Sequence, residues 1–214
     1  MASTILFTAA AVVFLLAAER RRTPDRPPTL EWVIKPHSSC GFLATAWTAG
    51  ATHSVFGLIT LAALAFSAAG DVLLIPDDNE RAAKGGIGAF AVGHVCYIAA
   101  FLYRGTDLRA ALPAAGVMLV VGAAAFVQLK PHTHGAMRTL VLLYVIICSL
   151  MAVTAAGASG ASHTPLFAAA AAFFVTSDIL TAQQIFVRRR FLYRLIGLPL
   201  YYSAQLLFAA GAAS

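Results

Sequence analysis

The sequence predicts an all-α integral membrane protein with eight transmembrane helices, arranged as two parallel four-helix repeats with both termini outside. Three observations predict this fold class. Hydrophobic residues make up 60% of the 214 residues and charged residues only 11%, whereas a soluble domain has about 25% charged residues. The apolar residues fall into eight runs, and the basic residues gather on one side of these runs. We expect a single transmembrane domain, 1–214, with pseudo-repeats of about 1–107 and 108–214.

Each apolar run is close to the ~20 residues that a helix needs to cross a bilayer. The first, 3–18, has no basic segment before it, so we expect a retained helix and not a cleaved signal peptide. The second, 33–49, contains Lys35, Pro36 and several hydroxyl side chains, and we expect it to be partly irregular. The others are 54–75, 85–103, 110–129, 137–156, 164–187 and 191–212. Helices are the only plausible element for runs this apolar.

The basic residues give an independent test of this count. With the N-terminus outside, the outward loops contain only Arg104 and Arg109, as the positive-inside rule expects. The net charge of +6 therefore indicates contact with anionic headgroups on the cytoplasmic side and no nucleic-acid partner. Without an organelle-targeting presequence, the Ala- and Arg-rich composition favours a bacterial plasma membrane. The inward basic residues are Arg20, Arg21, Arg22, Arg26, Lys35, Arg81, Lys84, Lys130, Arg138, Arg188, Arg189, Arg190 and Arg194.

Two aspartates, Asp71 and Asp178, lie inside these apolar runs. Placing a carboxylate in the hydrocarbon region costs roughly 2.5 to 3.5 kcal/mol, so such residues usually have a function. They are 107 positions apart (178 − 71), half of the chain. His94 follows Asp71 by 23 positions, and Tyr201 follows Asp178 by the same number. The third and fourth spans therefore correspond to the seventh and eighth, as in a parallel repeat.

Helical periodicity places further polar side chains near each aspartate. Thr60, Ser67 and Asp71 share one stripe of the third span, and the seventh span has a corresponding stripe of Ser177, Asp178, Thr181 and Gln184. Since Lys35 and Asp71 lie toward the inner ends of their spans, we expect a site that opens to the cytoplasmic leaflet, where a lipid could enter sideways. The expected site residues besides the aspartates are Lys35, His94, Tyr97, Ser177, Thr181, Tyr201, Tyr202 and Gln205.

The sequence predicts no metal and no cofactor. Each of the three cysteines stands alone in an apolar run, which is typical of a small buried hydrophobic residue. His132 and His134 have no cysteine or carboxylate nearby to complete a coordination shell. A membrane-embedded zinc amide hydrolase would need several histidines inside the bundle, and only His94 is centrally placed.

A proton-coupled transporter of small solutes is the main alternative. Parallel repeats and intramembrane aspartates also suit a carrier in which an aspartate loads and releases a proton. Transporters of this kind have helices interrupted at matched positions of the two halves. Here Pro199 has no counterpart in the first half, which favours an enzyme.

Five short motifs occur in a fixed order along the chain. They are KP (Lys35, Pro36), GDVLL (Gly70 to Leu74), AFxxGHxxY (Ala89 to Tyr97), SDxL (Ser177 to Leu180) and YYxAQ (Tyr201 to Gln205). In order and spacing the chain resembles the YhhN-like lysoplasmalogenase family over about residues 30–210. After Lys35 and Pro36 it departs from the family's pattern, with His37, Ser38 and Ser39 in place of an apolar residue and Thr. This departure leaves the headgroup preference open.

The resemblance implies a membrane hydrolase that acts on a lysophospholipid substrate. It would cleave the vinyl ether bond of lysoplasmalogens into a fatty aldehyde and glycerophosphoethanolamine or glycerophosphocholine. By the same resemblance, Asp71 and Asp178 match two acidic active-site positions.

Vinyl ether hydrolysis independently suits a pair of carboxyl groups. The β-carbon is protonated first, and water then attacks the resulting oxocarbenium ion at the α-carbon, so the site needs one protonated acid and one ionised base. In a low-dielectric pocket, desolvation and mutual repulsion keep a proton on one of two carboxyls. Because such a pair titrates as a unit, either aspartate could hold the proton. We assign Asp178 as general acid and Asp71 as the base that activates water, with Lys35 binding the phosphate. The residues expected to orient the pair and the water are His94, Tyr201, Tyr202 and Gln205.

Overall fold

Eight α-helices and three short helical turns make up the computed structural model, which describes residues 2–20, 30–76 and 79–213. The described residues contain no strand, which confirms the all-helical class. Arg21, Arg22 and Arg26 lie outside them. The elements are α1 (Ala2–Arg20), α2 (Glu31–Ala49), η1 (Ala51–His53), α3 (Val55–Leu73), α4 (Glu80–Arg104), α5 (Leu108–Leu129), η2 (Lys130–His132), α6 (Gly135–Ala161), α7 (Leu166–Ala182), η3 (Gln183–Val187) and α8 (Phe191–Gly211). Each predicted span corresponds to one α-helix, the seventh continuing into η3.

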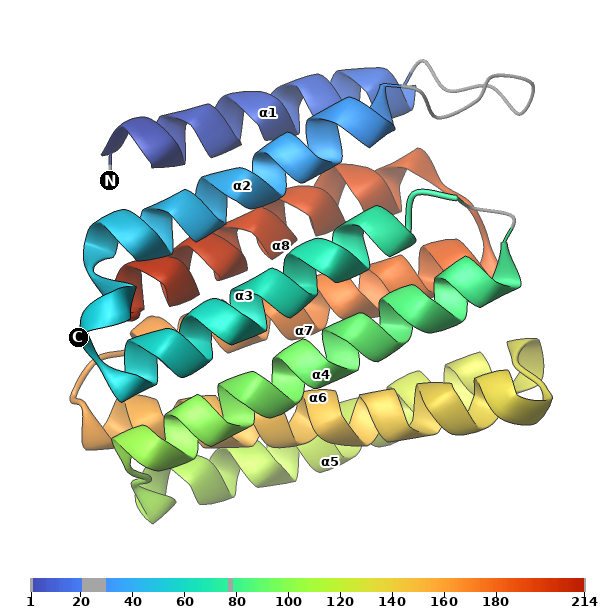
Figure 1. Ribbon diagram of the computed structural model, residues 1–214. Helices are drawn as coiled ribbons and strands as arrows, with labels where there is room; N and C mark the ends of the chain where they lie inside the picture. Colours follow the sequence, from blue (N-terminus) through green and yellow to red (C-terminus); the bar gives the residue numbers. More distant parts are fainter. Residues whose placement is uncertain (1, 21–29, 77–78, 214) are drawn as a thin grey trace.

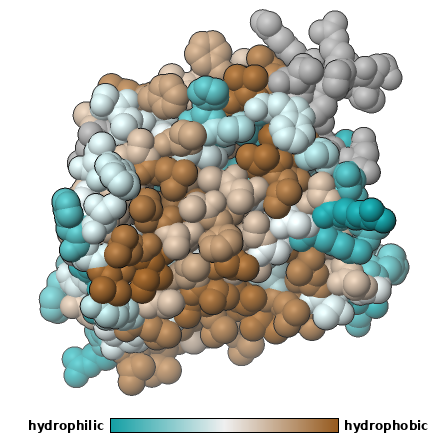
Figure 2. Space-filling model, in the orientation of Figure 1, coloured by the Kyte–Doolittle hydropathy of each residue, from teal (hydrophilic) through white to brown (hydrophobic). Residues whose placement is uncertain are grey.

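Five of the described helical segments are long and apolar enough to cross a membrane: Val55–Leu73, Glu80–Arg104, Leu108–His132, Gly135–Ala161 and Leu166–Val187. In α1 the apolar stretch is shorter, Ala2–Ala17. Figure 2 shows a broad apolar band across the side of the bundle, with hydrophilic residues toward both ends. Such a surface is typical of a protein that crosses the bilayer several times.

The helices lie side by side in one bundle (Figure 1). Its centre consists of α3, α4, α7 and α8, in which α3 packs on α4 and α7 on α8. On one flank α2 packs against α8 and is covered by α1, and on the other flank α6 packs against α4 and is covered by α5. Both termini lie at the end opposite the α3–α4 and α7–α8 connections (Figure 1).

Several helices begin after a polar residue whose side chain caps the first turn. The side chain of Ser54 accepts a hydrogen bond from the backbone N–H of Gly57 (3.0 Å) at the start of α3. At the start of α5, Asp107 accepts one from the backbone N–H of Arg109 (2.9 Å). These caps pair N–H groups that have no partner within the helix.

The expected irregularity of the second span is wrong, because α2 is helical from Glu31 to Ala49. Pro36 lies in the second turn and removes one backbone hydrogen bond of the helix. Two of its hydroxyl groups do not compete with the helix, since they bond back to carbonyls one turn earlier. Ser38 Oγ donates to the carbonyl of Ile34 (2.9 Å), and Thr45 Oγ1 to that of Gly41 (2.8 Å).

Glycine permits the close packing of α3 against α4. At Gly70, next to Asp71, an added Cβ would lie 2.6 Å from the ring of Phe90. We expect Gly70→Ala to destabilise the protein by about 1–3 kcal/mol, because a methyl group forced into a packed core displaces its neighbours. Thermal unfolding of the purified protein in detergent measures the effect.

Gly88 offers a matched control on α4, since nothing lies within 4 Å of a Cβ added there. Gly88→Ala should unfold at the same temperature as the original protein or higher, because Ala favours a helix over Gly by about 1 kcal/mol. Equal unfolding temperatures for the two variants would show that Gly70 is not needed for this contact.

Candidate active site

A cavity of about 160 Å³ lies beside α7 inside the bundle. Asp71 of α3 and Asp178 of α7 both line it. The predicted site residues in its wall are Lys35, Asp71, Ser177, Asp178, Thr181 and Tyr201. Side chains from both halves of the chain therefore meet around one space.

The wall facing α2, α3 and α8 is polar. We call this part the polar lobe and define it by Lys35, Asp71, Ser177, Arg194 and Tyr201. Lys35 is 5% exposed and Asp71 7%. The positive charge of Lys35 acts on the carboxylate of Asp71. Lys35 and Asp71 thus share a largely dehydrated part of the bundle.

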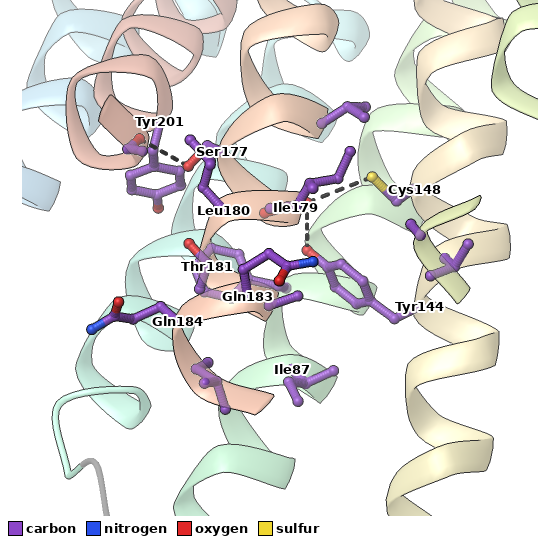
Figure 3. A pocket seen from close by; sticks show the side chains of 18 of the residues that line it. Ile87, Tyr144, Cys148, Ser177, Ile179, Leu180, Thr181, Gln183, Gln184 and Tyr201 are labelled. Carbon is purple, nitrogen blue, oxygen red and sulfur yellow. Dashed lines mark hydrogen bonds between the residues drawn. The ribbon is translucent and has the colours of Figure 1, made fainter. Parts of the chain in front are cut away.

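The wall facing α5 and α6 is apolar. We call this part the apolar lobe and define it by Met118, Val121, Ala125, Val141 and Val145. In Figure 3, Tyr201 of α8 lies on one side of α7, and Tyr144 and Cys148 of α6 lie on the other. The cavity therefore joins a charged region to a surface suited to a hydrocarbon chain.

Asp71 accepts two hydrogen bonds at the same carboxylate oxygen. Ser39 Oγ of α2 donates to Oδ2 (2.7 Å), and Tyr201 Oη of α8 donates to the same atom (2.8 Å). Ser177 of α7, the residue before Asp178, also forms part of this lobe. Its Oγ donates to the carbonyl of Gly197 (2.9 Å) and so links α7 to α8. These hydrogen bonds therefore join four helices, α2, α3, α7 and α8, around the polar lobe.

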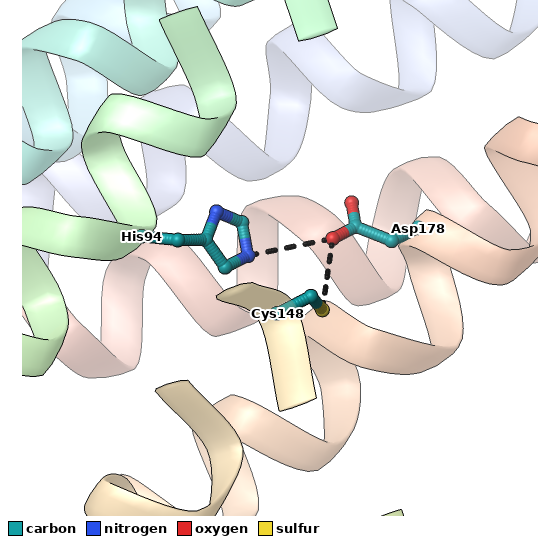
Figure 4. Close-up of side chains that lie close together, drawn as sticks. All are labelled: His94, Cys148 and Asp178. Carbon is teal, nitrogen blue, oxygen red and sulfur yellow. Dashed lines mark hydrogen bonds and ion pairs between the residues drawn. The ribbon is translucent and has the colours of Figure 1, made fainter. Parts of the chain in front are cut away.

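Asp178 has a different set of partners. Tyr144 Oη donates to Asp178 Oδ2 (2.8 Å), and the Cys148 thiol lies 3.5 Å from the same oxygen. His94 Nε2 lies 3.4 Å from it (Figure 4). The ring of His94 is held from behind, where Nδ1 lies 2.8 Å from the carbonyl oxygen of Phe90. Within the described residues, no hydrogen bond joins the two aspartates directly.

Among the residues that the structure describes, His94, Cys148 and Asp178 form a group that could hold a metal ion. Their nitrogen, sulfur and oxygen donors all lie within 4.8 Å of one another, and this mixture of donors suits zinc. Cys148 was predicted to be a structural residue without a second ligand type nearby. The bundle places two such ligands beside it, from helices distant in the sequence.

Some predicted site residues lie behind the cavity wall. Tyr97 Oη donates to Gln205 Oε1 (2.7 Å), and both side chains are fully buried. Tyr202 packs against the ring of Phe42, with centroids 6.3 Å apart. His94 is also fully buried and does not line the cavity, but its ring contacts Asp178, which does.

The sequence prediction did not include Ser39, Tyr144, Cys148 or Arg194 among the site residues. Three of them had a detectable signal. Tyr144 and Cys148 are four positions apart and so share a face of a strongly apolar helix. Ser39 similarly lies one turn after Lys35. Neither spacing identifies the aspartate that each residue contacts.

Comparison with known proteins adds to this geometry. Residues 30–212 match the model of the YhhN family. Over 187 residues the chain is 32% identical to lysoplasmalogenase TMEM86A of Bos taurus, a match that covers 85% of this chain and 72% of the bovine protein. No solved structure matches the chain.

Proposed function

Because the chain belongs to the YhhN family, we propose that it is a membrane-embedded hydrolase that cleaves the vinyl ether bond of lysoplasmalogens. The products are a fatty aldehyde and glycerophosphoethanolamine or glycerophosphocholine. The observation that supports this proposal best is the single cavity lined by Asp71, Asp178 and Lys35. The name of the bovine relative supports the same substrate class.

We further propose that all eight α-helices cross a plasma membrane, with both termini outside. Helices α1, α2 and α8 have 19, 19 and 21 residues, which at 1.5 Å per residue is about 30 Å, the thickness of the hydrocarbon core. Placing the basic connections in the cytoplasm follows the positive-inside rule and brings them to anionic headgroups.

The domain is proposed to consist of two parallel four-helix repeats. Exchanging α1 with α5, α2 with α6, α3 with α7 and α4 with α8 maps the main contacts onto one another. The pair α2 and α8 becomes α6 and α4, and the pair α3 and α4 becomes α7 and α8. The site follows the same exchange, since Tyr201 contacts Asp71 and His94 contacts Asp178.

The two lobes suggest how a lysoplasmalogen is oriented. Along the substrate, the phosphate is followed by the glycerol, the ether oxygen, the α-carbon, the β-carbon and the alkyl chain. With the phosphate near Lys35 and the chain in the apolar lobe, the α-carbon lies toward Asp71. The β-carbon then lies toward Asp178, which contacts α6 of the apolar lobe. This order supports Asp178 as acid and Asp71 as base.

The proposed reaction returns both carboxyls to their starting state. Asp178 gives its proton to the β-carbon, and an oxocarbenium ion forms that the Asp71 carboxylate stabilises. Asp71 takes a proton from water as the water oxygen bonds to the α-carbon, giving a hemiacetal. Asp178 then takes the hemiacetal hydroxyl proton while Asp71 protonates the departing glycerol oxygen. The carbon–oxygen bond breaks, and the aldehyde and the alcohol leave.

The other site residues position these groups. Ser39 and Tyr201 orient the carboxylate of Asp71, and Tyr144 orients Asp178. Ser177 and Thr181 lie in the wall, where they can contact the glycerol. The residues that support this wall from the buried side are Tyr97, Tyr202 and Gln205.

A direct assay tests the function. The purified protein in detergent, given lysoplasmalogen without an ion gradient or added metal, should release fatty aldehyde. The diacyl lipid of the same headgroup serves as the control, because it has no vinyl ether bond. If no aldehyde forms while reconstituted vesicles accumulate a solute, the protein is a transporter and the proposal is wrong.

The mechanism also predicts where solvent hydrogen enters the product. In D₂O the aldehyde should contain one deuterium at carbon 2 and none at carbon 1, because the acid protonates the β-carbon. Mass spectrometry of the derivatised aldehyde measures this, and unlabelled aldehyde incubated in D₂O corrects for spontaneous exchange. An aldehyde without enzyme-dependent deuterium would rule out protonation of the β-carbon.

A further inference from the structure

Two side chains from other helices converge on one carboxylate oxygen of Asp178. His94 Nε2 of α4 lies 3.4 Å from Oδ2, and Cys148 Sγ of α6 lies 3.5 Å from it. Figure 4 shows the ring nitrogen and the sulfur on either side of the space in front of this oxygen. Helices α4, α6 and α7 thus contribute a nitrogen, a sulfur and an oxygen, the three kinds of atom that bind zinc in proteins.

The distances between these atoms match those of a tetrahedral zinc site. With a Zn–N bond of about 2.05 Å, a Zn–O bond of about 2.1 Å and a Zn–S bond of about 2.3 Å, the nitrogen and oxygen ligands are about 3.4 Å apart, and the oxygen and sulfur ligands about 3.6 Å apart. The corresponding distances here are 3.4 Å and 3.5 Å. Neither contact with Asp178 therefore has to change when a zinc ion binds.

His94 presents a buried nitrogen atom without a hydrogen-bond partner. The residue is fully buried, and Nε2 forms no hydrogen bond with any part of the chain that the structure describes. The other ring nitrogen, Nδ1, lies 2.8 Å from the carbonyl oxygen of Phe90. Because a carbonyl oxygen only accepts, the neutral ring has its hydrogen on Nδ1 and a free lone pair on Nε2. Histidines that bind metals are usually held by such a bond.

The cavity reaches this group of donors from one side. Asp178 and Cys148 line it together with Tyr144, and the side chain of Asp178 is 17% exposed. Three protein ligands leave one position of a zinc tetrahedron for water from the cavity. A thiolate ligand favours zinc over magnesium, which prefers oxygen ligands.

We propose that His94, Cys148 and Asp178 bind a zinc ion, and that this ion inhibits the enzyme. On binding, the Cys148 thiol releases its proton to solvent, and the sulfur, the ring nitrogen and one carboxylate oxygen coordinate the metal. A carboxylate of Asp178 that coordinates zinc cannot also supply the proton that the β-carbon needs. The inhibition rests on the proposed function, whereas the binding of the metal does not.

Cobalt spectroscopy of the whole protein in detergent, without a histidine tag, tests the binding. Co²⁺ takes the place of zinc and absorbs characteristically when a thiolate coordinates it. We expect a cobalt–thiolate band that saturates at one ion per chain and that Zn²⁺, but not Mg²⁺, removes. The band should be absent from Cys148→Ser, because a hydroxyl group is a poor zinc ligand. It should persist in the matched control Cys40→Ser, which removes an exposed thiol.

Aldehyde release tests the inhibition. Saturating Zn²⁺ should lower the rate at least about 100-fold, the contribution of a general acid, and a chelator should restore it. Each variant is compared with itself, with and without zinc, so that a changed basal rate does not enter. In Cys148→Ser half-inhibition should require at least about 100-fold more zinc, since even an outer-shell partner of a metal contributes about 10- to 100-fold. Cys40→Ser should be as sensitive as the original protein.

Three results would overturn the inference. The original protein could give no cobalt–thiolate band, Cys148→Ser could be as sensitive to zinc as Cys40→Ser, or a chelator could abolish turnover that zinc restores. In the last case the metal would be required and not inhibitory. Circular dichroism verifies the folding of each variant, and Cys148→Ala replaces Cys148→Ser if the latter does not fold. A cobalt–thiolate band in a protein that releases no aldehyde would support the metal site and contradict only the proposed function.

Discussion

Asp178→Asn should lower the rate of aldehyde release by about 10²- to 10⁴-fold, because an amide cannot supply the proton that the β-carbon needs. Asp71→Asn should have an effect of similar size, since the amide neither accepts a proton from water nor stabilises the cation. Steady-state rates of aldehyde release measure both effects. Asn retains the shape of Asp, so Ser39 and Tyr144 keep a carbonyl oxygen to which they can donate.

Asp107→Asn is the matched control for these substitutions. Asp107 caps α5 outside the cavity, and Asn caps a helix about as well as Asp. This variant should keep its activity and its unfolding temperature. If Asp71→Asn and Asp178→Asn stay as active as Asp107→Asn, the acid and base assignments are wrong even where aldehyde is released.

Ala125→Phe should lower kcat/KM for long-chain substrates by about 60-fold. Ala125 lines the apolar lobe, and a phenyl ring there would occupy the space of about three methylene groups. At about 0.8 kcal/mol for each buried methylene, the loss is about 2.4 kcal/mol. Competition assays with alkenyl chains of different lengths measure it, and the shortest chains should be affected least.

Ala124 provides the control on the same helix, because it is exposed on the outer surface of α5. Ala124→Phe adds the same ring without entering the cavity and should leave kcat/KM unchanged for every chain length. Equal losses in the two variants, or a loss in Ala125→Phe that does not depend on chain length, would mean that the alkyl chain binds elsewhere.

The two aspartates differ in burial and in their partners, as the different roles in the proposed mechanism require. Asp71 is buried among hydroxyl donors beside Lys35, whereas Asp178 is half-buried at the border of the apolar lobe and faces a histidine. His94 of α4 contacts Asp178, and Tyr201 of α8, 107 positions later, contacts Asp71. Separation of acid and base roles by environment is a general way to obtain both from two carboxyls.

Much of the fold could be predicted from the sequence, because its signals are local. Apolar runs of helical length predicted eight helices, and all eight are present with similar bounds. The cost of a carboxylate in an apolar helix identified Asp71 and Asp178, and both line the cavity. His94 and Tyr201 were expected near the aspartates, and each contacts the aspartate of the opposite half, which the spacing did not indicate.

The partners of each aspartate within its own half depended on the tertiary structure. Asp178 meets Tyr144 and Cys148, and Asp71 meets Ser39, only because of the rotation and depth of α6 and α2 against their neighbours. Contacts such as that of Gly70 with Phe90 set this packing, and they join residues distant in the chain. Helical periodicity predicts which side chains share one face of a helix. Which face of a neighbouring helix they contact depends on the packing of the whole bundle. The helices and the two carboxyls were thus predictable from the sequence, whereas the polar and apolar lobes of the cavity exist only in the assembled fold.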